Sequence, residues 1–189
     1  MTHSRPVFAT SKLPTNNERT TIFDAAGTVI VSPYKGAIVK PLSVAEVVDI
    51  AELRLAVISL ALKPAHRYLS PADFDHAYDL AKPINRSRNA KDFFAHNRQF
   101  WDTILSKAQR PILCQVFRQL DDRMTRYDPF FLKLFPTPET RPRQREALIE
   151  IYRKGKIADA FRAFRKLYLE VVDQFVDHLN RHEAEEPAG

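Results

Sequence analysis

The fold class is decided by residues 43–62, which read SVAEVVDIAELRLAVISLAL. Ser43 and Glu46 have the spacing of a capping box, in which the serine side chain accepts from the third helical residue and the glutamate reaches back. Hydrophobic residues then recur at helical spacing as far as Leu62, and Pro64 is expected to end the helix. The stretch therefore predicts a long amphipathic helix with a well-defined start.

Downstream of this helix, almost every segment has a helical pattern. Ser70 and Pro71 mark a second helix start, Pro111 marks another, and Gly155 is a typical helix end. Helices are expected at about 71–82, 90–108, 111–124, 143–154 and 157–180, with an aromatic, proline-punctuated connection at 129–142. The sequence thus predicts an all-α fold, an antiparallel helical bundle of six to seven helices.

The residues before Ser43 have a different character. Two β-branched runs, 28–31 and 37–39, are separated by a turn-like segment that ends at Gly36, so a small β-hairpin is expected over 28–40. A short helix over 17–26 is also expected, but threonines weaken it. The expected organisation is a partial head at 1–42, a helical domain at 43–182 and a frayed tail at 183–189.

Composition narrows the function classes. The 189 residues include only four glycines, against about thirteen at average usage, which disfavours phosphate-binding loops and multi-stranded β folds. A single cysteine, Cys114, excludes an internal disulfide and a cysteine-based zinc site. The net charge is +6, and residues 1–43 carry five basic and two acidic side chains, as expected of a segment that approaches a polyanion.

Targeting signals and catalytic patterns are not evident in the sequence. The first ten residues lack the apolar stretch of a signal peptide, and the longest apolar run, 57–62, is too short to span a membrane, so a cytoplasmic protein is expected. His178 and His182 have the spacing of a metal-binding pair, although a solvated helix face is the more common explanation. No nucleophile elbow, phosphate loop or paired-carboxylate signature is present, so we do not expect an enzyme.

The junction between the two parts resembles a known family. Residues 32–43, followed by Glu46-Val47 and by 52–56, resemble the wing-to-effector-domain junction of GntR-family transcriptional regulators, and in particular the FadR-like subfamily with an FCD ligand-binding domain. Further landmarks agree in order and spacing at 97–101, 110–113, 145–149 and 155–163. The similarity covers roughly residues 27–180.

This resemblance implies a homodimeric DNA-binding regulator whose helical domain binds a small, often anionic metabolite such as a carboxylate. Lys35, beside Tyr34, would occupy the wing tip and meet DNA phosphate, with an ordinary turn and a solvated lysine as the alternative. Arg19 falls in the segment that aligns with the recognition helix. Only twenty-six residues precede Gly27, and a recognition helix needs partner helices to hold its register in the groove. The expected DNA-binding head is therefore incomplete.

The resemblance also identifies the expected ligand site. Many FCD domains hold a divalent metal with an Asp or Asn and three histidines, whereas the matching positions here are Asn97, Trp101, Arg145 and Leu167. An indole, a guanidinium and an aliphatic chain cannot complete a metal sphere, so no metal or other cofactor is expected. Arg145 would instead pair with a ligand anion, with a surface or salt-bridging arginine beside Arg141 and Arg143 as the alternative. Trp101 would form either a stacking wall or core, and Arg54 of the junction completes the expected ligand-binding set.

The expected function is ligand-responsive transcriptional regulation through DNA, a small-molecule effector and a second copy of the chain, without membrane association. The alternative is a free-standing metabolite-binding or dimerisation module that does not bind DNA by itself.

Overall fold

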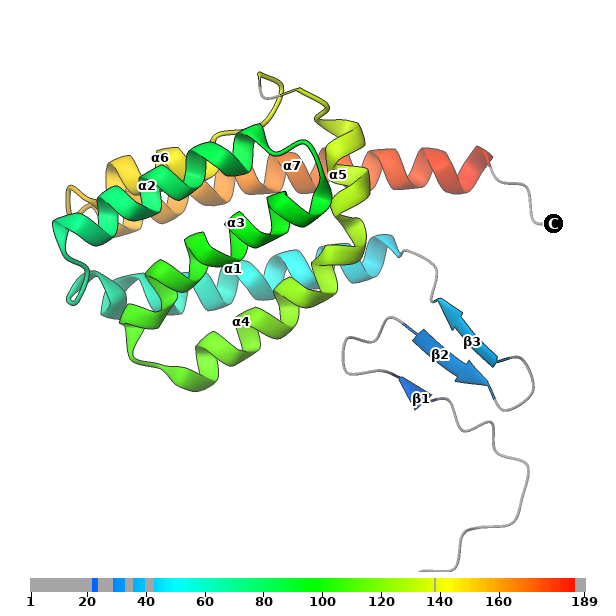
Figure 1. The fold of residues 1–189 in the computed structure, drawn as a ribbon, viewed down its shortest axis with the longest axis horizontal. Helices are drawn as coiled ribbons and strands as arrows, with labels where there is room; N and C mark the ends of the chain where they lie inside the picture. The colour runs from blue at the N-terminus through cyan, green and yellow to red at the C-terminus, as the bar shows by residue number, and fades with distance from the viewer. Residues whose placement is uncertain (1–21, 24–28, 33–35, 40–42, 138, 186–189) are drawn as a thin grey trace, which may run out of the picture.

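The structure is a computed structural model that describes residues 22–23, 29–32, 36–39, 43–137 and 139–185. The helices are α1 (Val44–His66), α2 (Pro71–Arg86), α3 (Ala90–Leu105), α4 (Pro111–Met124), α5 (Asp128–Leu134), α6 (Gln144–Tyr152) and α7 (Ile157–Glu185), with 3₁₀ turns η1 (Ser106–Ala108) and η2 (Thr125–Tyr127). These helices form one bundle, as predicted (Figure 1).

Short strands precede the bundle in the sequence: β1 (Ile22–Phe23), β2 (Val29–Ser32) and β3 (Gly36–Val39). They pair antiparallel in the order β1-β2-β3, with Ser32 opposite Gly36. Residues 33–35, the tip of the expected hairpin, lie outside the described residues. The helix expected over 17–26 is wrong at the two described positions, because Ile22 and Phe23 pair with β2 as a strand.

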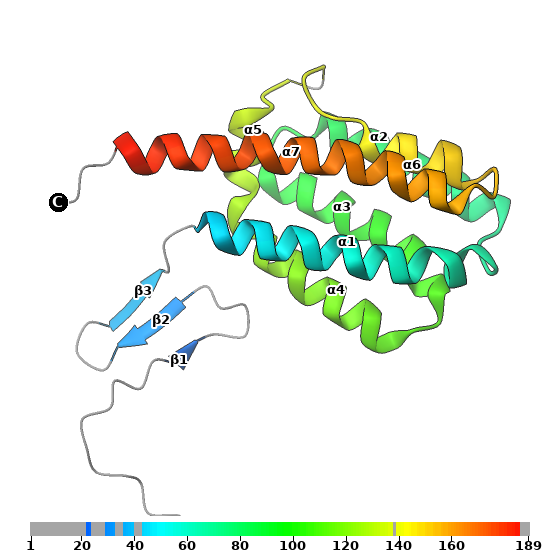
Figure 2. The ribbon, with the colours of Figure 1, turned by 180° about the vertical axis from the view of Figure 1, so that it is seen from behind.

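The bundle is organised around α1 and α7, which run side by side along its length (Figure 2). α6 packs against α7, and α2 packs against both α3 and α6. α4 lies beside α1 and leads through η2 and α5 back towards α7. This arrangement brings α1, α3, α4, α6 and α7 together around one interior, which is where the candidate site lies.

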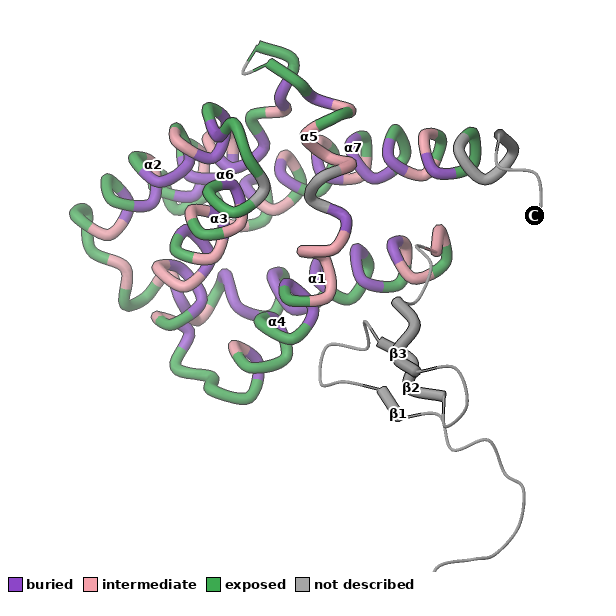
Figure 3. Tube along the Cα trace, turned by 45° about the vertical axis from the view of Figure 1, so that its right-hand side comes forward, coloured by how far each residue is buried: buried purple, intermediate pink, exposed green. Residues whose placement is uncertain are grey.

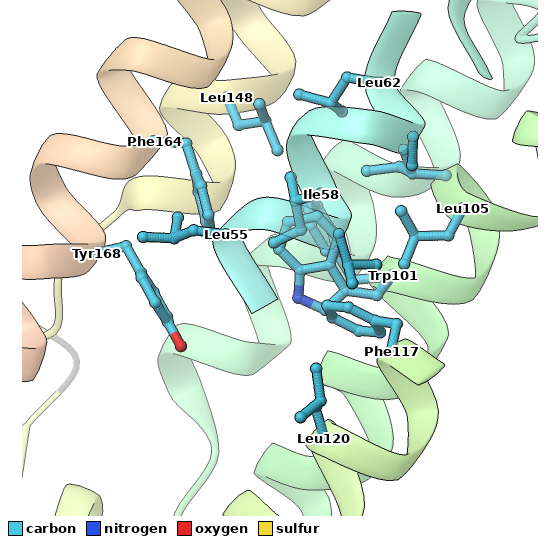
Figure 4. Packing of buried hydrophobic residues seen from close by; sticks show 14 of the residues in the cluster. Leu55, Ile58, Leu62, Trp101, Leu105, Phe117, Leu120, Leu148, Phe164 and Tyr168 are labelled. Atoms are coloured by element: carbon cyan, nitrogen blue, oxygen red, sulfur yellow. The ribbon is translucent and has the colours of Figure 1, made fainter. Parts of the chain in front are cut away.

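Buried side chains face inward on every long helix, whereas the outer faces are exposed (Figure 3). Trp101 is the largest fully buried side chain, and its ring packs on Phe100, Phe117 and Phe164 at centroid separations of 5.0, 5.4 and 5.3 Å. Figure 4 shows this indole among the side chains of α1 and α4. Among the described residues, no helix is both long and apolar enough to cross a membrane.

Two helices continue past the prolines that were expected to end them. α1 extends two residues beyond Pro64, and α2 extends three beyond Pro83. Proline removes one backbone donor from a helix. At Pro64 the carbonyl that loses its donor is that of Leu60, which accepts from the Arg110 guanidinium at 3.5 Å. This replacement partner explains why the first proline does not end its helix.

The start of α1 confirms half of the expected capping box. The Ser43 hydroxyl accepts from the Glu46 backbone at 3.4 Å. The Glu46 carboxylate accepts from the Tyr127 hydroxyl at 3.0 Å, and the Ser43 backbone N–H donates to the same hydroxyl at 3.3 Å. In a capping box the glutamate carboxylate would accept from the Ser43 backbone N–H, and here the hydroxyl of the distant Tyr127 is the acceptor instead. The connection expected over 129–142 is also partly wrong, because α5 forms there and its Phe131 packs on Phe93 at 4.8 Å.

Candidate functional site

A cavity lies between α1, α3, α4, α5, α6 and α7, and Tyr127 of η2 also lines it. Its volume is about 60 Å³. Most of its wall is apolar or aromatic, and the polar groups come from a small set of buried side chains: Arg54, Asn97, Asp121, Gln144 and Arg145. A mostly apolar cavity with a few converging polar groups is typical of a small-molecule site.

The polar groups form a continuous chain across four helices. Arg54 on α1 pairs with Asp121 on α4, with 2.9 Å between Nη2 and Oδ1. The Asn97 amide on α3 donates to the same Asp121 oxygen at 3.1 Å. Arg145 on α6 donates to the Asn97 amide oxygen from Nε at 3.0 Å and from Nη2 at 2.6 Å. Each helix thus contributes one polar side chain to a single network.

The network holds more positive than negative charge. Arg54, Arg145 and Asp121 are 5%, 8% and 2% exposed, so two guanidiniums and one carboxylate are buried together. Burial raises the pKa of the Asp121 carboxyl, and the guanidiniums of Arg54, Arg98 and Arg145 oppose that rise. A buried cation is costly unless an anion pairs with it. The Asp121 carboxylate pairs with one of these guanidiniums, and both guanidiniums line the cavity.

Three of the expected ligand residues lie together at this cavity. Arg54, Asn97 and Arg145 all line it, and Arg145 is buried, so it is not a surface arginine, whereas the salt-bridging alternative stays open. Trp101 is a core side chain that does not line the cavity, because its indole lies one helical turn further along α3, among aromatic rings. Leu167 is half-buried on α7 and does not line the cavity either.

Ligand contact by any of these residues stays a prediction. The expected DNA-binding residues Arg19, Tyr34 and Lys35 lie outside the described residues.

Sequence reasoning missed several residues of the cavity, among them Asp121, Gln144 and Tyr168. Asp121 is followed by Asp122, and two adjacent carboxylates are usually exposed to solvent. Asp121 nevertheless lies four residues after Phe117, so both side chains lie on the inward side of α4. Gln144 lines the cavity from the first position of α6. Tyr168, rather than Leu167, faces the cavity from α7, because it lies four residues after the buried Phe164 and stacks on that ring at 5.4 Å.

The four positions that match the family's metal ligands do not fit a divalent cation. The Asn97 amide oxygen already accepts two N–H groups from Arg145, whose positive charge would repel a metal at that point. Trp101 offers only an indole N–H inside the aromatic core, and Leu167 offers no donor atom. Within the described part of the chain, no group of three His, Cys, Asp or Glu side chains is placed to hold a metal ion.

The cavity is connected to the start of α1 through Tyr127. Its buried ring lines the cavity, and its hydroxyl bonds Glu46 and Ser43 as described above. Arg126 lies 3.5 Å from the same Glu46 carboxylate. Burial raises the pKa of the Tyr127 hydroxyl, so it is a neutral donor at ordinary pH. One side chain therefore contacts both the cavity and the residue that caps α1.

The bundle is similar to solved structures of proteins from three bacteria. A GntR-family transcriptional regulator from Pseudomonas syringae pv. tomato matches with a TM-score of 0.66 and 19% identity, over 85% of this chain and 68% of that chain. McbR/YncC of E. coli matches with a TM-score of 0.63 and 20% identity, over 84% and 79%. Lar, described as controlling expression of the Listeria monocytogenes agr system and mediating virulence, matches with a TM-score of 0.61 and 18% identity, over 80% and 74%.

At these identities the structural likeness shows the fold alone. No curated protein sequence matches the chain. The FCD domain, in contrast, matches residues 49–169, which span α1 to α7 and include every residue of the buried polar network. More than half of the sequence lies within this match, and the chain belongs to the FCD domain family.

Proposed function

We propose that this chain is a cytoplasmic, ligand-responsive transcriptional regulator of the GntR/FadR-like kind, in which the helical domain binds a small anionic metabolite without a metal. The FCD match and the likeness to bacterial regulators support this class of function. DNA contact is assigned to the residues before Ser43, whose expected contacts are Arg19, Tyr34 and Lys35. The regulator acts as a homodimer, as the family resemblance implies.

The observation that carries the ligand proposal is that two buried guanidiniums line one cavity. Arg54 and Arg145 lie at one cavity with Asp121 as the buried carboxylate of their network. A guanidinium is the side chain best suited to bind a carboxylate, because its N–H groups match both oxygens. A carboxylate in the cavity would accept hydrogen bonds from these guanidiniums.

The cavity volume limits the size of this anion. A cavity needs about 10–15 Å³ to hold one water molecule, so a volume of about 60 Å³ has room for a small ligand. The effector that fits without rearrangement is therefore a small anion. The apolar remainder of the wall favours a short carboxylate over a highly hydrated, polyvalent ion.

Tyr127 provides the means by which an occupied cavity acts on the rest of the chain. Its ring lies at the cavity, and its hydroxyl bonds Glu46 and Ser43, where the chain enters α1. An anion that displaces the ring alters these bonds, and it therefore changes how the preceding segment joins the bundle. An effector can shift an equilibrium only by binding its states differently, and this contact gives the two states different energies.

Ligand binding is tested by the midpoint of thermal unfolding in sodium formate, acetate, glycolate and phosphate, each against sodium chloride at equal ionic strength. The midpoint should rise with at least one short carboxylate, because a ligand that binds only the folded state stabilises it. Arg145→Gln should lose this rise, and Arg165→Gln, which removes an exposed arginine of α7, should retain it. Equal rises in both variants would exclude Arg145 from the site.

Regulation requires DNA binding, which is tested by retention on double-stranded DNA as the salt concentration increases from low ionic strength. A phosphate-binding head gives an affinity that falls linearly with salt on logarithmic axes. No retention at low salt would refute the regulator function, and would favour the free-standing ligand-binding module.

A further inference from the structure

Two buried polar atoms at the cavity have no hydrogen-bond partner within the described part of the chain. They are the side-chain amide oxygen of Gln144 and the hydroxyl of Tyr168. Both residues line the cavity, and they are only 2% and 8% exposed. An unpaired polar group away from water is costly, and the large majority of buried polar groups in proteins have a partner. A partner for both atoms is therefore expected inside the cavity.

The two side chains reach the cavity from α6 and α7, which pack against each other, and they lie beside the two guanidiniums. Gln144 is the first residue of α6 and directly precedes Arg145. The Tyr168 ring stacks on Phe164 at 5.4 Å, and its centroid lies 5.9 Å from the Arg54 guanidinium. Figure 4 shows the Tyr168 hydroxyl directed away from Phe164. Each of the two unpartnered groups thus accompanies one of the arginines assigned to the anion.

The chemistry of the two groups limits what their partner can be. A carboxylate has only acceptors, so it can accept from the Tyr168 hydroxyl but has no proton to donate to the Gln144 oxygen. The Gln144 oxygen requires an N–H or O–H donor. A hydroxyl group meets both needs, because it donates one hydrogen bond and also accepts. An ammonium group would also donate, but its positive charge would lie close to Arg54 and Arg145 and be repelled by them.

We propose that the effector is a short hydroxycarboxylate whose hydroxyl group lies between Gln144 and Tyr168. The ligand hydroxyl donates to the Gln144 amide oxygen and accepts from the Tyr168 hydroxyl, while the ligand carboxylate pairs with the guanidiniums. The cavity volume of about 60 Å³ favours short members of this class. The proposal rests on the anion site of the proposed function, and it assigns Gln144 and Tyr168 as the residues that determine specificity.

The ligand is tested with compounds that differ from glycolate in one group. Acetate lacks the hydroxyl, methoxyacetate keeps its oxygen without a proton to donate, and glycine carries an ammonium group instead. Titration calorimetry at neutral pH and constant ionic strength measures the dissociation constant of each. Glycolate should bind at least about tenfold more tightly than acetate, because a site built for a hydroxyl rejects the analogue that lacks it. Methoxyacetate and glycine should bind no more tightly than acetate.

The two specificity residues are tested by the ratio of the acetate and glycolate dissociation constants. Gln144→Leu and Tyr168→Phe should each reduce this ratio towards one, because the ligand hydroxyl then loses one of its partners. Gln99→Leu and Tyr68→Phe make the same changes at exposed positions and should keep the wild-type ratio. Circular dichroism verifies that each variant is folded. Tyr168→Phe keeps the aromatic ring, so its effect on the ratio reports the hydroxyl alone.

The outcomes separate this proposal from the anion site on which it rests. Binding of none of the four compounds would refute the anion site and the hydroxycarboxylate together. Equal affinities for acetate and glycolate would leave the anion site intact and overturn the hydroxyl preference. Glycine that binds as tightly as glycolate would replace the hydroxyl with an ammonium group. A wild-type ratio in both Gln144→Leu and Tyr168→Phe would overturn their assignment as specificity residues.

Discussion

Arg54 and Asn97 lie one helical turn from Ile58 and Trp101 on the same two helices, yet the two levels of the interior differ in chemistry. At the level of Trp101, the bundle is apolar and closely packed by aromatic rings. At the level of Asn97, four polar side chains, three of them charged, surround a cavity. An apolar level of similar volume is often as stable as a buried ion pair or more so, so stability alone does not account for the polar level. The comparison separates a Trp101 level that holds the bundle together from an Asn97 level to which we assign the proposed binding of an anion.

The largest expected effect on stability comes from removing the Trp101 indole, which lies at the centre of the apolar level. Trp101→Ala should lower the free energy of unfolding by about 3–5 kcal/mol, because a fully buried indole is replaced by a cavity. Urea denaturation measures the loss. Arg165→Gln, on the exposed side of α7, serves as the control and should change it by less than about 0.5 kcal/mol. A loss below about 1 kcal/mol would show that the apolar level is not the stabilising one.

Removing the Asp121 carboxylate from the polar level should lower the free energy of unfolding by a slightly smaller amount. Asp121→Ala should cost about 3 kcal/mol, because Arg54 then lies buried without its carboxylate. The double variant Arg54→Met, Asp121→Leu should recover most of this loss in the same urea assay, since apolar residues replace the pair. The anion-dependent rise in the unfolding midpoint should disappear in the double variant. A double variant that is stable and still responds to carboxylates would contradict the binding role of this level.

A smaller loss of stability is expected from a change at Tyr127, which connects the polar level to the start of α1. Tyr127→Phe keeps the ring at the cavity and removes the hydroxyl that bonds Glu46 and Ser43. The expected loss is about 1 kcal/mol, the usual net value of one hydrogen bond. Amide hydrogen exchange should increase at residues 44–47, at the first turn of α1. Exchange that is unchanged there would show that Tyr127 does not link the cavity to this helix start.

The smallest expected effect on stability concerns the ion pair between Asp73 and Lys107, which lies outside both levels. Hydrogen bonds from Lys107 and Ser70 lower the pKa of Asp73 from 3.8 to about 2. Because the folded-state pKa is the lower one, the stabilisation is present above about pH 4 and is lost as the pH falls towards 2. The carboxylate is 21% exposed and solvent-screened, so we expect only about 0.5–1 kcal/mol.

Urea unfolding of the wild type and of Asp73→Asn, compared at pH 5 and at pH 2.5, measures this difference. The gap between the two proteins should narrow at the lower pH. A gap that widens would reverse the assigned direction of the pKa shift.

Local rules account for much of the bundle. The caps at Ser43 and Ser70 and the proline start at Pro111 are confirmed, because each is decided by residues within one turn. The ends at Pro64 and Pro83 are wrong, and at Pro64 the reason is a residue far along the chain. Arg110, fifty residues away from Leu60, satisfies the carbonyl that Pro64 leaves without a donor.

The residues of the candidate site likewise include some that the sequence identifies and others that only the packing of the helices shows. The family resemblance identified Arg54, Asn97 and Arg145, but it could not show that Asp121 joins the first two. The charge of Asp121 predicts an exposed side chain, whereas its place on the inward side of α4 predicts a buried one. Only the packing of α4 against α1 shows that the side chain is buried. Tyr168 differs from the expected Leu167 by one residue, which turns the side chain by about 100° around the helix.

The central claim, that the polar level binds a small anion through its guanidiniums, is tested most directly by the side-chain Nε–Hε resonances of the arginines in a ¹⁵N-labelled sample. Sodium acetate and formate are titrated against sodium chloride at equal ionic strength. The account predicts saturable shifts of the Arg145 and Arg54 resonances, assigned by single substitution, while the exposed Arg165 does not respond. Shifts that are absent from both buried arginines, or equal across all arginines, would contradict it.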